Sequence, residues 1–156
     1  MTARFPGLFV LPAAVALIGI SGCGSSVEIP RTVPVKGKVT YKDQPLADAE
    51  VAFVSKLDNK DVLAARGMTN SAGEFSLTTY IDPQHEVSGA TPGDYVVTVN
   101  KSETMSTEQT MKMFKENPMM EFKKLVPDEY TLKDKSPLEA SVTVGGENTF
   151  DFTLKD

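Results

Sequence analysis

The sequence predicts an all-β protein, an antiparallel β-sandwich of about seven strands. Three observations carry the prediction. Apolar and polar residues alternate with a period of two in several short segments, turn-forming residues bound each segment, and only one stretch of the chain has helix-forming composition. Of the 156 residues, 40% are hydrophobic and 24% are charged, as expected for one globular domain.

Six of the seven expected strands have one apolar face and one polar face, and Leu63–Met68 is expected as a short partner of the Phe75 strand. The seven segments are Val33–Tyr41, Ala49–Phe53, Leu63–Met68, Phe75–Leu77, Tyr95–Val99, Leu138–Val144 and Phe150–Leu154. We expect the third and fourth strands to pair through the turn at 70–73, and the last two to pair across the tight turn at 145–148. Consecutive strands joined by such short turns favour a sandwich.

One segment, residues 102–124, breaks the alternation. Ser106 followed by Gln109 resembles a capping box, and Thr107 to Glu116 has helix-forming composition until Pro118 interrupts it. The sequence therefore predicts a short helical excursion near residues 106–123, between two strands.

The first residues have the pattern of a targeting segment. Arg4 precedes an apolar run from Leu8 to Ile20, which is well short of the ~20 residues that a membrane-spanning helix needs. We expect residues 1–22 to be a signal peptide, residues 23–32 to be a polar tether and residues 33–156 to form the β-sandwich domain.

The chain has one cysteine, Cys23, directly after the apolar run. Its glycine and serine neighbours offer no apolar packing for a core thiol, and the one histidine, His85, has no pattern that would tie it to a nucleophile. The stretch Ile20-Ser21-Gly22-Cys23 resembles the bacterial lipobox, with Ile20 where leucine is usual. The resemblance implies a diacylglycerol on the Cys23 sulfur, which would anchor the protein to a lipid bilayer.

Localisation follows from the same residues. A lipobox implies the bacterial cell envelope, and Gly24 is not the acidic residue that, in the enterobacterial rule, retains a lipoprotein at the inner membrane. We therefore expect a lipid-anchored protein of the outer membrane.

Charge and motifs argue against several function classes. The formal net charge of -5 and the scattered basic residues argue against a nucleic-acid partner. Nucleophile-elbow, phosphate-loop, zinc-protease and paired-cysteine motifs do not occur in the sequence. We expect no enzyme activity, no cofactor and no resident metal.

Four stretches resemble the carboxypeptidase-regulatory-like, transthyretin-like domains of small bacterial lipoproteins. These stretches are "VPVKGKVTYKDQPLADAEVAFV" (33–54), "GMTNSAGEFSLTTY" (67–80), "GATPGDYVVTV" (89–99) and "LVPDEYTLKDKSPLEASVTVGGENTFDFTL" (125–154). The resemblance implies a seven-stranded Greek-key sandwich and a non-catalytic accessory role. Within it, Gly37 would allow a close backbone approach and Gly73 would supply a positive φ.

Three functions fit these expectations. The leading one is a non-enzymatic envelope lipoprotein whose sandwich is a binding, adhesion or structural module for an envelope protein or a glycan. The second is a carbohydrate-binding or substrate-docking module. The third is a Cu(I)-handling protein that uses the thioethers of Met111, Met113, Met119 and Met120, although these methionines equally fit an adaptable apolar packing surface.

Overall fold

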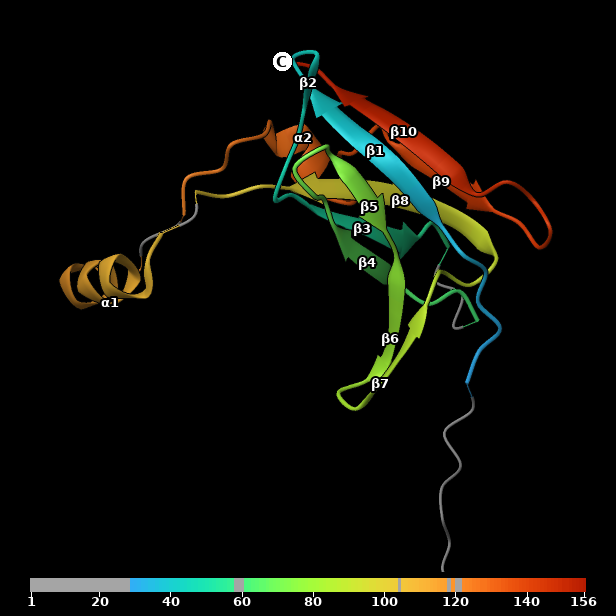
Figure 1. The fold of residues 1–156 in the computed structure, drawn as a ribbon. Helices are drawn as coiled ribbons and strands as arrows, with labels where there is room; N and C mark the ends of the chain where they lie inside the picture. The colour runs from blue at the N-terminus through green and yellow to red at the C-terminus, as the bar shows by residue number, and fades with distance from the viewer. Residues whose placement is uncertain (1–28, 58–60, 104, 118, 120–121) are drawn as a thin grey trace, which may run out of the picture.

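The computed structural model describes residues 29–57, 61–103, 105–117, 119 and 122–156. They form two packed β-sheets and two helices (Figure 1). The strands are β1 (Lys36–Tyr41), β2 (Gln44–Pro45), β3 (Glu50–Ser55), β4 (Ala65–Met68), β5 (Glu74–Ser76), β6 (Thr78–Asp82), β7 (His85–Ser88), β8 (Gly93–Asn100), β9 (Glu139–Val142) and β10 (Thr149–Leu154). The predicted all-β class is confirmed.

Every one of the seven expected segments overlaps a strand, and the predicted apolar faces point into the core. Val51 and Phe53 of β3 and Val97 of β8 are fully buried, while residues between them remain half-exposed. Alternation identifies these strands because each sheet has one face on the core and one face in solvent. The described chain nevertheless has ten strands rather than seven, because the prediction missed β2, β6 and β7.

The six-stranded sheet has the order β7-β6-β4-β3-β8-β9, and all its neighbouring strands are antiparallel. In the smaller sheet, β1 lies between β10 on one side and both β5 and β2 on the other. The β1–β10 pair is parallel, with Gly37 opposite Phe150. The prediction of a wholly antiparallel sandwich is therefore wrong at this pair.

Two predicted pairings are also wrong, for one physical reason. The turn at 145–148 does not close a hairpin, because β9 pairs with β8 and β10 pairs with β1 in the other sheet. The turn at 70–73 likewise joins β4 to β5, which pairs with β1. Both turns lead from one sheet to the other. Strands that follow each other in sequence therefore lie on opposite sides of the core.

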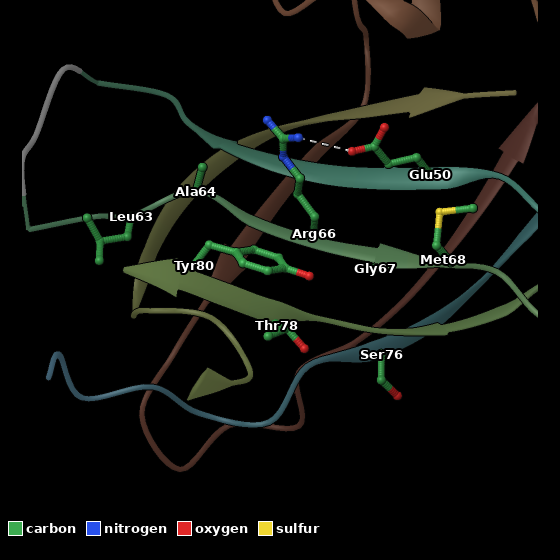
Figure 2. A pocket seen from close by; sticks show the side chains of 9 residues that line it. All are labelled: Glu50, Leu63, Ala64, Arg66, Gly67, Met68, Ser76, Thr78 and Tyr80. Carbon is green, nitrogen blue, oxygen red and sulfur yellow. Dashed lines mark hydrogen bonds and ion pairs between the residues drawn. The ribbon is translucent and has the colours of Figure 1, made fainter. Parts of the chain in front are cut away.

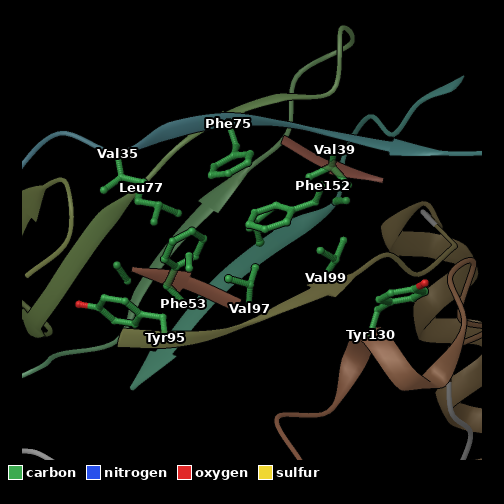
Figure 3. Close-up of a cluster of buried hydrophobic side chains, with 14 of the residues drawn as sticks. Val35, Val39, Phe53, Phe75, Leu77, Tyr95, Val97, Val99, Tyr130 and Phe152 are labelled. Atoms are coloured by element: carbon green, nitrogen blue, oxygen red, sulfur yellow. The ribbon is translucent and has the colours of Figure 1, made fainter. Parts of the chain in front are cut away.

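The core lies between the sheets and is centred on Phe53 (Figure 3). Its ring centroid lies 5.6 Å from that of Tyr95, 5.7 Å from that of Phe150 and 6.2 Å from that of Phe152. These tilted and edge-to-face contacts bring together rings from β3, β8 and β10. A strand from each sheet is thus needed to complete the aromatic cluster.

Helix α1 (Thr107–Glu116) is held apart from the sheets, and none of its residues is buried (Figure 1). The expected capping box is confirmed: Ser106 Oγ accepts from the Gln109 N–H at 3.2 Å, and the Gln109 side chain accepts from the Ser106 N–H at 2.9 Å. Backbone hydrogen bonds from Glu103 to Lys123 and from Leu125 to Lys101 join the two ends of this excursion. The helix occupies only part of the predicted excursion.

A second short helix, α2 (Asp128–Thr131), was not predicted. Tyr130 is its buried residue, and the Tyr130 hydroxyl accepts from the Lys155 N–H at 3.2 Å. This contact holds α2 against the end of β10.

Candidate functional site

The expected lipid-attachment residue, Cys23, and the whole lipobox lie outside the described residues. Val33, where the described chain enters the fold, is fixed by two backbone hydrogen bonds with Ala90, at 2.9 and 3.0 Å. The Thr32 hydroxyl also donates to the Ser88 carbonyl at 2.9 Å. Residues Thr32 and Val33 are therefore hydrogen-bonded to the chain at the end of β7.

The methionines of the Cu(I) hypothesis lie on or near α1. Met111 is 62% exposed, Met113 is half-buried and Met119 is 89% exposed, while Met120 lies outside the described residues. Residues two positions apart on an α-helix do not face each other, so α1 separates Met111 from Met113. The structure does not bring these two thioethers to one point.

His85 begins β7, at the tip of the β6–β7 hairpin. The Asp82 carboxylate accepts from the backbone N–H groups of Gln84 and His85, at 2.8 and 3.0 Å, and lies 2.8 Å from the His85 ring Nδ1. The hydrogen bond from Gln84, together with that of the His85 ring, lowers the pKa of Asp82. These contacts close a tight turn, so the structure gives His85 a role in that turn.

The main cavity among the described residues is a groove of about 680 Å³ on the solvent face of the six-stranded sheet (Figure 2). We call it the β4 groove. Its lining residues are Glu50, Leu63, Ala64, Arg66, Gly67, Met68, Ser76, Thr78 and Tyr80. Its volume lies within the range of ~300–1,000 Å³ that is typical of small-molecule sites.

Strand pairing explains why these side chains gather. Arg66 on β4 lies directly opposite Thr78 on β6, and Glu50 on β3 lies opposite Met68 on β4. Side chains two positions apart on a strand share a face, which places Tyr80 on the same side as Thr78. The groove therefore consists mainly of outward-facing residues of β3, β4 and β6, with Ser76 of β5 and the two residues before β4 completing the lining.

Gly67 allows β4 to lie directly against the chain that leads from β5 to β6. A Cβ atom at this position would lie 2.2 Å from the Ser76 carbonyl oxygen, because the chain leading from β5 to β6 passes directly against β4. Backbone here approaches backbone so closely that only glycine fits.

The polar groups of the groove combine one cation with one anion. Arg66 Nη1 lies 3.3 Å from Glu50 Oε1, and the two side chains are 62% and 39% exposed. This single contact leaves the other Arg66 donors available, since a guanidinium has five. Among the described residues, the hydroxyls of Ser76 and Thr78 make no hydrogen bond to another protein group.

Tyr80 supplies the aromatic surface. It is 57% exposed, and its ring lies between Arg66 and Thr78, with Met68 farther along the groove (Figure 2). An exposed ring flanked by an arginine, a carboxylate and free hydroxyls can stack against a ligand and hydrogen-bond its edge.

Sequence reasoning did not identify any groove residue as a site. The sequence placed Arg66 and Met68 in an expected strand without marking either as a binding residue, and Tyr80 lay outside the seven expected strands. The β-branched and aromatic residues from Thr78 to Ile81 were the available signal for a strand, but only the fold shows that β6 lies beside β4.

Three further observations complete the description of the site. The described residues contain no group of three or more His, Cys, Asp or Glu side chains positioned to hold a metal ion. No helix in the same part of the chain has the length and apolar character to cross a membrane. Comparisons with family models, with curated proteins and with solved structures found no match to this chain.

Proposed function

We propose that this protein is a lipid-anchored, non-enzymatic binding module of the bacterial cell envelope, and that the β4 groove is its binding surface. The observation that carries the binding role is the groove itself: it is lined by an exposed tyrosine, an arginine–glutamate pair and two hydroxyls on the solvent face of the six-stranded sheet. The lipobox-like residues that end at Cys23 support the anchor.

The sandwich is proposed to be a transthyretin-like, carboxypeptidase-regulatory-like domain with Greek-key connections. The two-sheet architecture supports this assignment, as do two glycines of the resembling stretches. A Cβ on Gly37 would lie 1.9 Å from the Phe150 carbonyl oxygen, and Gly73 has φ +76°. These residues serve the fold, in keeping with an accessory role.

A non-catalytic role is supported by the chemistry of the groove. Glu50 is the one carboxylate of its lining, and Arg66 partly neutralises it. General acid–base catalysis generally requires a positioned proton donor or acceptor whose pKa is tuned to its task, often as one of a pair. The lining is equipped to hydrogen-bond a ligand rather than to transform it.

The anchor is tested by metabolic labelling of expressing bacteria with an alkyne fatty acid, comparing the unchanged protein with Cys23→Ala. We expect label on the unchanged chain and none on the variant, because the cysteine sulfur is the proposed attachment atom. Ser25→Ala, two residues away, is the matched control and should label normally. Equal labelling of Cys23→Ala would refute the lipid anchor.

A further inference from the structure

We infer that the β4 groove binds a neutral saccharide chain, stacked on Tyr80 and hydrogen-bonded by Arg66, Glu50 and the strand hydroxyls. The inference rests on the proposed binding role of the groove and adds the chemical class of its ligand. Three properties of the groove lead to this class.

The first property is the charge of the lining. Arg66 and Glu50 are its two formally charged residues, and they lie 3.3 Å apart, so their charges cancel. Phosphate or polyanion sites instead collect an excess of positive groups. A balanced pair offers donors and acceptors side by side, which matches neighbouring hydroxyl groups of a sugar, since each hydroxyl both donates and accepts.

The second property is the position of the strands. β3 pairs with strands on both sides, and β4 pairs with β3 along its length and with β6 at Ala65 and Arg66. Beyond Arg66, Gly67 lies directly against the Ser76 backbone. An extended peptide is commonly held by main-chain hydrogen bonds to a sheet edge. The close approach of Gly67 and Ser76 leaves no room for an added strand between β4 and β5, so the groove must recognise its ligand through side chains.

The third property is the surface of Tyr80. The ring is 57% exposed beside the Thr78 and Arg66 side chains (Figure 2). The face of a pyranose ring presents C–H groups and its rim presents hydroxyls, so an aromatic plane bordered by polar groups fits both parts. Ser76 and Thr78 supply further hydroxyls along the groove.

The test uses the full chain in detergent micelles, screened against immobilised neutral hexaoses of glucose, mannose and N-acetylglucosamine. Polygalacturonate and a casein-derived peptide mixture serve as anionic and peptidic probes. We expect at least one neutral hexaose to bind, and Tyr80→Ala to weaken that binding by roughly tenfold or more, as for an aromatic anchor. Tyr80→Phe should bind nearly normally, because it keeps the stacking face, and Arg66→Ala should weaken binding.

Phe114→Ala removes another exposed aromatic side chain, on α1, and should bind as the unchanged protein does. The inference is overturned if no neutral hexaose binds, if the bound one is indifferent to Tyr80→Ala, or if polygalacturonate or peptide binds in preference. Circular dichroism confirms that the variants are folded. Because this assay needs no membrane, its failure is distinct from a failure of Cys23 labelling.

Discussion

At the scale of single residues, Tyr95 places a hydrogen-bonded hydroxyl group inside the core. Its side chain is fully buried, and its hydroxyl donates to the Thr91 carbonyl at 2.6 Å and lies 2.8 Å from Thr91 Oγ1. Thr91 Oγ1 also accepts from the Leu63 N–H at 3.0 Å. This network ties the start of β8 to the segment that enters the β4 groove.

Tyr95→Phe should lower the free energy of unfolding by about 1–3 kcal/mol, because it leaves buried groups of Thr91 without their partner. Urea unfolding followed by circular dichroism measures the change. Tyr80→Phe is the matched control, since it removes a hydroxyl from an exposed ring and should leave stability unchanged. Equal stability of the two variants would contradict the role of the Tyr95 hydroxyl.

Burial also raises the pKa of Tyr95 above its ordinary value of 10.0. A raised pKa in the folded state means that the stabilising contribution is complete below the unfolded-state pKa near 10 and is lost as the pH rises from there through the higher folded-state pKa. The parent protein should therefore lose stability above pH 10, and Tyr95→Phe should lose less over the same range.

At the scale of elements, α1 is stabilised locally rather than by the core. It has ten residues and none of them is buried, although isolated helices shorter than ~12–15 residues are marginal in water. The Phe114 and Phe122 rings, with centroids 6.2 Å apart, are one local contact, and the capping box is another. The helix therefore depends on its N-cap more than a packed helix would.

Ser106→Ala should cost about 1 kcal/mol of helix stability and unfold α1 while the sandwich keeps its melting temperature. Amide hydrogen exchange measured by NMR reports the two parts separately: faster exchange is expected at Thr110 to Met113 and unchanged exchange in β3. Lys112→Ala, an exposed mid-helix change, should leave α1 formed. A lower melting temperature for Ser106→Ala would contradict this and would show that α1 stabilises the β-sandwich.

Strand alternation and the capping box were readable from the sequence because each depends on residues close together in the chain. Phe53 and Val97 reveal a buried face by spacing alone, and Ser106 with Gln109 reveals a helix start. The β6–β7 hairpin was missed because its segment contains Pro83 and several polar residues, which are typical of loops. The β4 groove was missed because Arg66, Glu50 and Tyr80 meet only through the pairing of separate strands.

At the scale of the whole molecule, Gly37 allows β1 and β10, which are far apart in sequence, to pair. Its missing side chain leaves room for the Phe150 carbonyl oxygen on one side and the Phe75 ring on the other. Gly37 of β1 can therefore lie opposite both Phe150 of β10 and Phe75 of β5. This brings the rings of both strands into the aromatic cluster around Phe53.

Gly37→Ala should lower the free energy of unfolding by more than about 4 kcal/mol, because the new Cβ would overlap the Phe150 carbonyl oxygen in the β1–β10 pair. Soluble yield and thermal unfolding by circular dichroism measure the effect. The neighbouring exposed change Lys36→Ala should alter the melting temperature little. If Gly37→Ala had nearly the melting temperature of the unchanged protein, the close approach of β1 and β10 would not be needed for stability.

The parallel β1–β10 pair also sets the order of events when the chain is made. Thr40 and Thr153, whose hydroxyls lie 3.2 Å apart, are separated by 113 residues in sequence. Because β10 follows β1 by more than 100 residues, β1 has an open edge until β10 has been synthesised, and contacts of such long range form slowly. The chain is thus kept from closing its fold early, and a product cut short before Thr149 would expose a strand edge to other chains.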